Sequence, residues 1–99
     1  MIKIEVTHDD ITVLGHAMYD DYGKDIVCAA VSSVITTSVE IAAAFNIESI
    51  DLSEYDDKLI IVRNMHDETT EKIIYTMLNL LKELEEQYPK NIKIINKEE

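Results

Sequence analysis

The sequence predicts a small α+β domain in which a mixed sheet packs against two helices, in the order ββαββαβ. Its 99 residues suit one domain, and 46% of them are hydrophobic, enough to form a core. Two long segments have helical character, and several short segments alternate apolar and polar residues as half-buried strands do. We therefore expect residues 1–99 to form a single domain.

A hairpin is predicted at the amino end of the chain. Residues 2–6 alternate apolar and charged side chains, which is the period of a strand with one buried face. Residues 8–10, His-Asp-Asp, are typical of a turn, and residues 11–14 return as a second strand. The following stretch, residues 15–24, lacks periodicity and is predicted to be a loop.

Residues 25–45 are predicted to form a buried helix. Their apolar side chains, including several alanines, are spread around all sides of a helical wheel. Many of them are β-branched, which weakens helix propensity and leaves a pair of strands as a competing interpretation. The length of the segment and its alanines favour the helix.

Three more strands are expected in the second half of the chain. Residues 50–52 and 59–62 are two strand candidates on either side of an acidic turn at residues 54–57, and the second has the stronger pattern. Residues 92–94 alternate like a short final strand.

Between these strands, the clearest amphipathic helix of the chain begins after Asp67, which can cap it, and ends before Pro89, whose ring blocks continuation. Glu68 and Glu71 place negative charge in its first turn, where the helix dipole favours it. One face carries an apolar stripe, formed by Ile73, Ile74, Met77, Leu78, Leu81 and Leu84.

The charge of the chain excludes some partners. Its formal net charge is −11, which argues against direct binding to a nucleic-acid backbone. The same charge would attract a basic protein, although acidic surfaces also serve solubility. The alternating amino terminus is unlike a signal peptide, and we expect that no apolar run is long and pure enough to span a bilayer, which favours the cytoplasm.

Cys28 is the only cysteine, so an internal disulfide is excluded and a structural zinc site rich in thiolates is not expected. It is therefore either a packing residue or a reactive thiol. If Asp25 caps the helix, Cys28 lies in the first turn, where free N–H groups and the helix dipole favour a thiolate and could bind an oxyanion. His16 could accept the thiol proton, and Asp25 could also orient that imidazole.

Other arrangements of these residues are weaker. A lone cysteine in an apolar helix is usually a buried hydrophobe. A metal site made from His16, Cys28, Asp20 and Asp21 lacks a recognised ligand spacing. His8 and His66 lie among acids in turns and are interpreted as surface residues, so we expect no metal ligands.

Gly-His-Ala at 15–17, Gly23, Asp-Ile-Val-Cys-Ala-Ala at 25–30 and Ser32 resemble the signature of the bacterial ribosomal-processing cysteine proteases (Prp). The resemblance extends over essentially the whole chain. It implies a catalytic dyad of His16 and Cys28 supported by Asp25. Substrate contacts are expected from the segment around the dyad, namely Gly15, Tyr19, Asp20, Asp21, Tyr22, Gly23 and Ser32.

The resemblance also implies an activity. Members of this family remove a short N-terminal extension from large-subunit ribosomal protein twenty-seven during ribosome assembly, without a cofactor, and are typically homodimers. A basic ribosomal protein as substrate agrees with the acidic balance of this chain. The rival hypothesis is a non-catalytic acidic module that binds a ribosomal protein or assembly factor, with Cys28 as a packing residue.

Overall fold

The computed structural model describes residues 1–15 and 22–98, and the side chains of residues 22–25 are outside that description. The described part contains five strands and two helices in the predicted order. They are β1 (Ile2–Val6), β2 (Asp10–Leu14), α1 (Tyr22–Phe45), β3 (Ile50–Glu54), β4 (Lys58–Arg63), α2 (Glu68–Gln87) and β5 (Ile92–Asn96).

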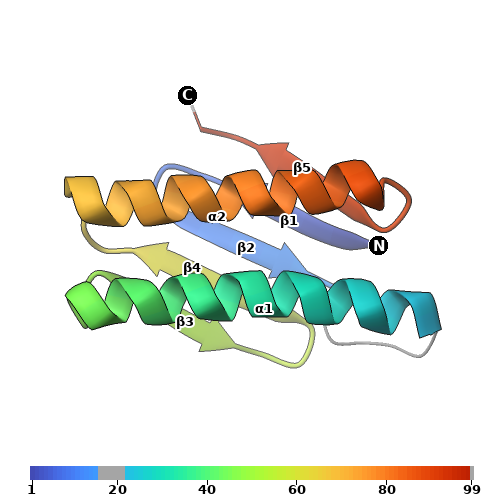
Figure 1. Cartoon of the computed structure of the whole chain (residues 1–99), viewed down its shortest axis with the longest axis horizontal. Helices are drawn as coiled ribbons and strands as arrows, with labels where there is room; N and C mark the ends of the chain where they lie inside the picture. The colour runs from blue at the N-terminus through green and yellow to red at the C-terminus, as the bar shows by residue number, and fades with distance from the viewer. Residues whose placement is uncertain (16–21, 99) are drawn as a thin grey trace.

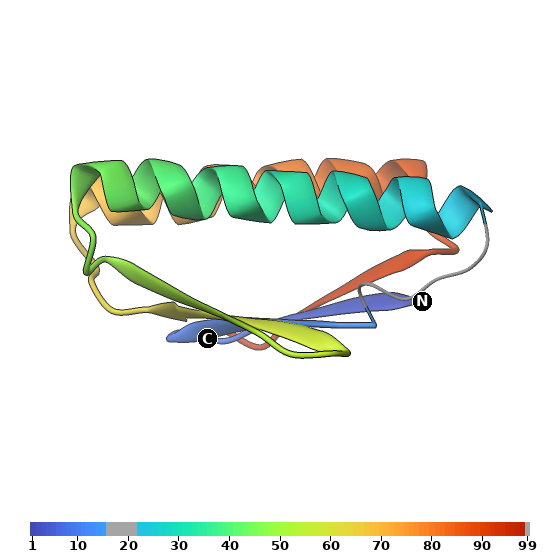
Figure 2. The same cartoon turned by 90° about the horizontal axis from the view of Figure 1, so that it is seen from below.

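The strands form one mixed sheet in the order β3-β4-β2-β1-β5 (Figure 1). β1 and β5 pair in parallel, and the other neighbours pair antiparallel. Both helices lie on the same face of this sheet, so the domain has two layers (Figure 2). The α+β class with a mixed sheet and two helices is therefore confirmed.

The predicted amino-terminal hairpin is confirmed. Ile4 pairs with Val13 and Val6 with Ile11, so the apolar side chains of both strands share the face that the helices cover. The turn is closed by the Thr7 hydroxyl, which donates to the Asp10 carboxylate at 2.8 Å. This hairpin supplies the centre of the sheet.

The predicted cap and apolar stripe of α2 are also confirmed. The carboxylate of the exposed Asp67 accepts hydrogen bonds from the backbone N–H and the hydroxyl of Thr70, and the bond from the hydroxyl lowers the pKa of Asp67. Ile74, Met77 and Leu81 are fully buried against the sheet. Each contributes about 1.5–3 kcal/mol by leaving water.

Helix α1 differs from the expectation in two ways. It begins at Tyr22, three residues before Asp25, and it buries one face only. The buried face consists of Val27, Val31, Ile35, Ser38 and Ala42. The other side leaves apolar residues exposed because the sheet and α2 cover only part of a helix in a two-layer fold; examples are Ile26, Ile41 and Phe45.

The expectation that no apolar run is long and pure enough to span a bilayer is wrong, judged by the length and composition of one helix. Residues Ile26–Phe45 of α1 are long and apolar enough to cross a membrane, with a mean hydropathy of 1.8 and 28% of the stretch buried. In this fold the same helix supplies core residues, and a core helix satisfies the same criteria.

Candidate active site

Cys28 is the seventh residue of α1 and is half-buried. Its side chain packs against the hydrophobic core without being sealed inside it. A thiol in this position is within reach of a ligand that approaches the surface of α1. The packing and nucleophile interpretations therefore both remain compatible with its burial.

The expectation that Cys28 lies in the first turn of the helix is wrong, because α1 begins at Tyr22. The N–H groups that an α-helix leaves free are those of its first four residues, here 22–25. The N–H of Cys28 belongs to the repeating hydrogen-bond pattern of the helix interior, so the expected oxyanion site at that N–H is not formed. The dipole effect is also weaker, since it falls off within the first turn.

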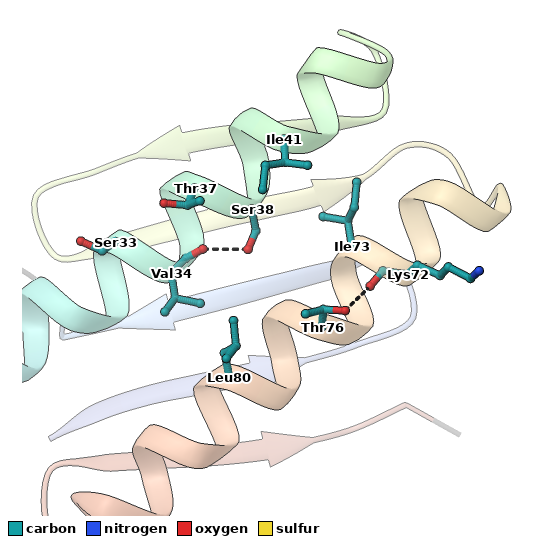
Figure 3. A pocket seen from close by; sticks show the side chains of 9 residues that line it. All are labelled: Ser33, Val34, Thr37, Ser38, Ile41, Lys72, Ile73, Thr76 and Leu80. Atoms are coloured by element: carbon teal, nitrogen blue, oxygen red, sulfur yellow. Dashed lines mark hydrogen bonds between the residues drawn. The ribbon is translucent and has the colours of Figure 1, made fainter.

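The two flanks of α1 have different surroundings. Val34 and Ile41 point toward α2, where they face Ile73 and Leu80 across an open groove (Figure 3). Cys28 lies on the flank turned away from α2, as the 3.6-residue repeat of the helix requires. Ser32, one turn later on that flank, is also half-buried, which confirms that the two residues share a helix face.

Gly15 directly follows β2 and has a conformation that favours glycine, with φ +83°. A Cβ atom at this position would lie 2.8 Å from the backbone oxygen of Met1, so the contact leaves no room for a side chain. Its N–H donates to the backbone oxygen of Asp57 at 2.9 Å. The residue that precedes His16 in sequence is thereby fixed between the amino terminus and the turn that joins β3 to β4.

The sequence did not indicate that the turn between β3 and β4 contacts Gly15. The turn is acidic, with Asp56 and Asp57 following Glu54 at the end of β3, and it exposes Tyr55, over whose ring the Lys58 ammonium lies at 5.4 Å. Figure 1 places it at the same end of the molecule as the amino end of α1. Gly15 and this acidic turn are about forty positions apart, and no sequence signal indicates their contact, because pairing between β2 and β4 creates it.

Several predicted site residues fall outside this description. His16, Tyr19, Asp20 and Asp21 lie outside the described residues. The backbone of Tyr22, Gly23 and Asp25 is described as the first turn of α1, which corrects the prediction that residues 22–24 belong to a loop. Asp21 and Asp25 are equally suitable residue types for a cap, so sequence alone could not choose between the two starting points.

The family model of the cysteine protease Prp matches residues 1–93. The chain belongs to this family. It is therefore a cysteine protease, and the alternative of a non-catalytic module is not supported. The Prp fold accounts for the whole domain described above.

Similar proteins extend this finding. The ribosomal processing cysteine protease Prp of Staphylococcus aureus (strain Mu50) is 34% identical over 105 residues, which cover 95% of this chain and 97% of that protein. A crystal structure of the essential ribosomal processing protease Prp from S. aureus with a substrate peptide has a TM-score of 0.88 and 30% identity, covering 98% of this chain and all of that one. A second, with a covalently linked product peptide, has a TM-score of 0.85 and 31% identity at the same coverage.

Proposed function

We propose that Cys28 is the nucleophile of this protease and His16 its general base. The observation that carries the proposal is that a cysteine protease requires a thiol and this chain has one cysteine, half-buried on the flank of α1 turned away from α2. The covalently linked product peptide in the related S. aureus structure supports chemistry through a covalent intermediate.

The choice of His16 follows from the placement of the other histidines. The chain has three, and His8 and His66 stack on each other in the β1–β2 turn and the β4–α2 connection. Figure 1 places both segments at the end of the molecule opposite the amino end of α1. His16 directly follows Gly15, which is fixed at the other end, and precedes Cys28 by twelve positions in the sequence.

In the proposed mechanism, the His16 imidazole takes the thiol proton and Sγ of Cys28 attacks the carbonyl carbon of the scissile peptide bond. The tetrahedral intermediate collapses, the C–N bond breaks, and the imidazolium protonates the leaving amine. Water then hydrolyses the thioester, with His16 accepting its proton, and regenerates the thiol. Asp25, one turn before Cys28 in α1, is proposed to hold the imidazole in the required tautomer.

Because Cys28 lies beyond the first turn, the dipole of α1 contributes little to forming its thiolate. Activation is therefore proposed to depend on His16. The oxyanion donors are proposed to come from groups other than the N–H of Cys28, which the helix already uses.

The proposed substrate is a basic ribosomal protein with an N-terminal extension, namely large-subunit ribosomal protein twenty-seven. The names of the S. aureus relatives support a substrate in ribosomal processing. The net charge of −11 and the acidic β3–β4 turn would speed the encounter with a basic chain. Substrate contacts are proposed for Gly15, Tyr19, Asp20, Asp21, Tyr22, Gly23 and Ser32. We also propose that the protease acts in the cytoplasm, where ribosomes assemble.

A homodimer is proposed to form through the outer face of the two helices. The groove between them has a volume of about 470 Å³ and is lined mainly by apolar groups (Figure 3). Between Ile26 and Phe45, Glu40 is the one charged residue, so two chains of net charge −11 repel least along this helix. Ile41→Glu should increase the monomer fraction in sedimentation velocity, whereas Ile47→Glu, outside the groove, should leave it unchanged.

The activity is tested by mixing the protein with large-subunit ribosomal protein twenty-seven that carries its extension and measuring product mass. Shortening by the wild type, its loss in Cys28→Ala and in His16→Ala, and its retention in Thr36→Ala are expected. Thr36 is an exposed residue of α1 and serves as the matched control. Unchanged cleavage by Cys28→Ala would refute the nucleophile assignment.

A further inference from the structure

Two histidines far apart in the sequence meet at the end of the domain opposite Cys28. His8 lies in the turn between β1 and β2, and His66 in the connection between β4 and α2. The sequence gives no reason to expect contact between the two side chains, and each alone is an ordinary surface turn residue. Strand pairing brings them together, because β2 pairs with β4 and the Arg63 N–H donates to the backbone oxygen of Asp9 at 2.8 Å.

The side chains that meet there are metal-ligand types. The rings of His8 and His66 stack with centroids 4.8 Å apart and an angle of 8° between their planes. Nε2 of His66 lies 3.8 Å from Oδ1 of Asp9. One donor atom from each of the three residues lies within 4.8 Å of the other two.

These separations are close to those of a metal site. Ligand atoms around a tetrahedral zinc ion are about 3.3 Å apart, given bond lengths near 2.0–2.1 Å. The donor atoms therefore need to approach by roughly 1.5 Å at most. Asp9 and His8 have the freedom to do so, since the Asp9 side chain is 73% exposed and His8 is an exposed turn residue whose ring can turn.

One of the two imidazoles is already oriented by a second carboxylate. Nδ1 of His66 lies 2.7 Å from Oε2 of Glu71, whose other oxygen accepts from Nη1 of the buried Arg63 at 2.9 Å. A carboxylate bonded to a cation is an acceptor, so the proton of the neutral imidazole is assigned to Nδ1. This leaves the lone pair of Nε2 free on the side of Asp9.

This arrangement is the carboxylate–histidine pairing that orients and strengthens histidine ligands in metal sites. It is built on a rigid base, because the Arg63 side chain is only 6% exposed and also reaches Glu98 at 3.5 Å. The surrounding charge favours a cation, since the chain carries −11. The cluster thus combines two imidazoles, one carboxylate and a supporting hydrogen bond.

We propose that His8, Asp9 and His66 bind a divalent transition metal of the zinc type, with Glu71 as the positioning residue of His66. Two imidazoles and one carboxylate are a common protein ligand set for Zn²⁺, with water in the fourth position. The site is distinct from the proposed Cys28–His16 pair. Its exposure leaves the fourth position open to a side chain of another molecule.

The test must separate this site from the thiol and imidazole of the proposed active site, which could also bind Zn²⁺. All variants are therefore made in the full chain carrying Cys28→Ser and His16→Ala. Titration with ZnCl₂ is followed by calorimetry and by the imidazole carbon-bound proton signals of His8 and His66 in NMR spectra. One ion per chain should bind and should shift both histidine signals.

His8→Ala and Asp9→Asn should each weaken Zn²⁺ binding by tenfold or more, and Glu71→Gln should weaken it by about 10–100-fold. Asp56→Asn, which removes the same charge at the other end of the domain, should change it by less than twofold. His8 and Asp9 are exposed turn residues, so these two variants keep the test valid if changes at His66 or Glu71 disturb folding, as circular dichroism would reveal. The proposal would be overturned if the chain carrying Cys28→Ser and His16→Ala did not bind Zn²⁺. It would also be overturned if His8→Ala and Asp9→Asn left the affinity for Zn²⁺ unchanged.

Discussion

Helices α1 and α2 lie side by side on one face of the sheet and are similar in length, with 24 and 20 residues. Helix α2 is a packing element whose two ends are defined by its own sequence, through the Asp67 cap and Pro89. Helix α1 carries the proposed nucleophile, and its starting point differs from the one that its sequence indicated. Both helices supply core residues, but the one with clear local signals is mainly a packing element, whereas the one with weak signals also carries the proposed nucleophile.

The largest expected effect concerns α1. Cys28→Ala should reduce cleavage at least about a thousandfold, because no other thiol can replace the nucleophile. The free energy of unfolding should fall by only about 1 kcal/mol, because a single half-buried sulfur is removed. Product mass in single-turnover reactions and urea denaturation measure the two quantities.

A Cys28→Ala variant that keeps its cleavage rate, or that loses it only because the domain unfolds, would contradict the division of roles between the helices. Thr36→Ala, on the exposed surface of the same helix, is the control for general effects of substitution in α1.

The next largest effect is on stability and concerns α2. Leu81→Ala should lower the free energy of unfolding by about 2–5 kcal/mol, since the Leu81 side chain is fully buried and its loss leaves a cavity. Leu80→Ala, at an adjacent position that is 41% exposed, should cost less than about 1 kcal/mol at protein concentrations where the chain is monomeric. Urea denaturation gives both values, and similar losses would show that α2 does not pack as described.

A substitution at Gly15 tests whether close backbone contacts fix the start of the segment that precedes α1. Gly15→Ala should destabilise the domain by about 1–3 kcal/mol, because alanine disfavours φ +83° and its Cβ would meet the Met1 oxygen at 2.8 Å. It should also lower the cleavage rate by shifting His16. Thermal denaturation and the cleavage assay are the measurements, and a variant as stable as the wild type would contradict the close contact.

The smallest effect concerns the first turn of α2 and depends on pH. Partial burial alone would raise the pKa of Glu71, but the hydrogen bond from His66 and the charge of Arg63 outweigh it and lower the pKa below its usual 4.5. A lowered pKa in the folded state means that the ionised Glu71 stabilises the fold above pH 4.5, and this contribution is lost as the pH falls through the lower folded value.

Glu71→Gln should therefore cost about 1 kcal/mol at pH 7, a small value because solvent screens a side chain that is 38% exposed. The difference from the wild type should shrink as the pH falls below 4.5. Urea denaturation at several pH values measures it. Glu83→Gln, on the exposed face of α2, is the matched control and should show no comparable pH dependence.

Local sequence patterns predicted the order of the elements, the amino-terminal hairpin and the limits of α2, because alternation, capping residues and proline act over a few neighbouring positions. The sequence also left Cys28 as the one candidate for a thiol nucleophile, since the chain has no other cysteine. The resemblance in residues 15–32 pointed to the protease family whose model matches residues 1–93.

The buried face of α1 could not be read from the sequence, since apolar residues surround that helix and a two-layer fold covers just part of it. The structure also shows that helix formation starts at Tyr22, which moves Cys28 away from the free N–H groups. Finally, it places His8 against His66 and the acidic β3–β4 turn beside Gly15. These contacts arise from pairing between strands distant in the chain, and local sequence patterns carry no record of such pairing.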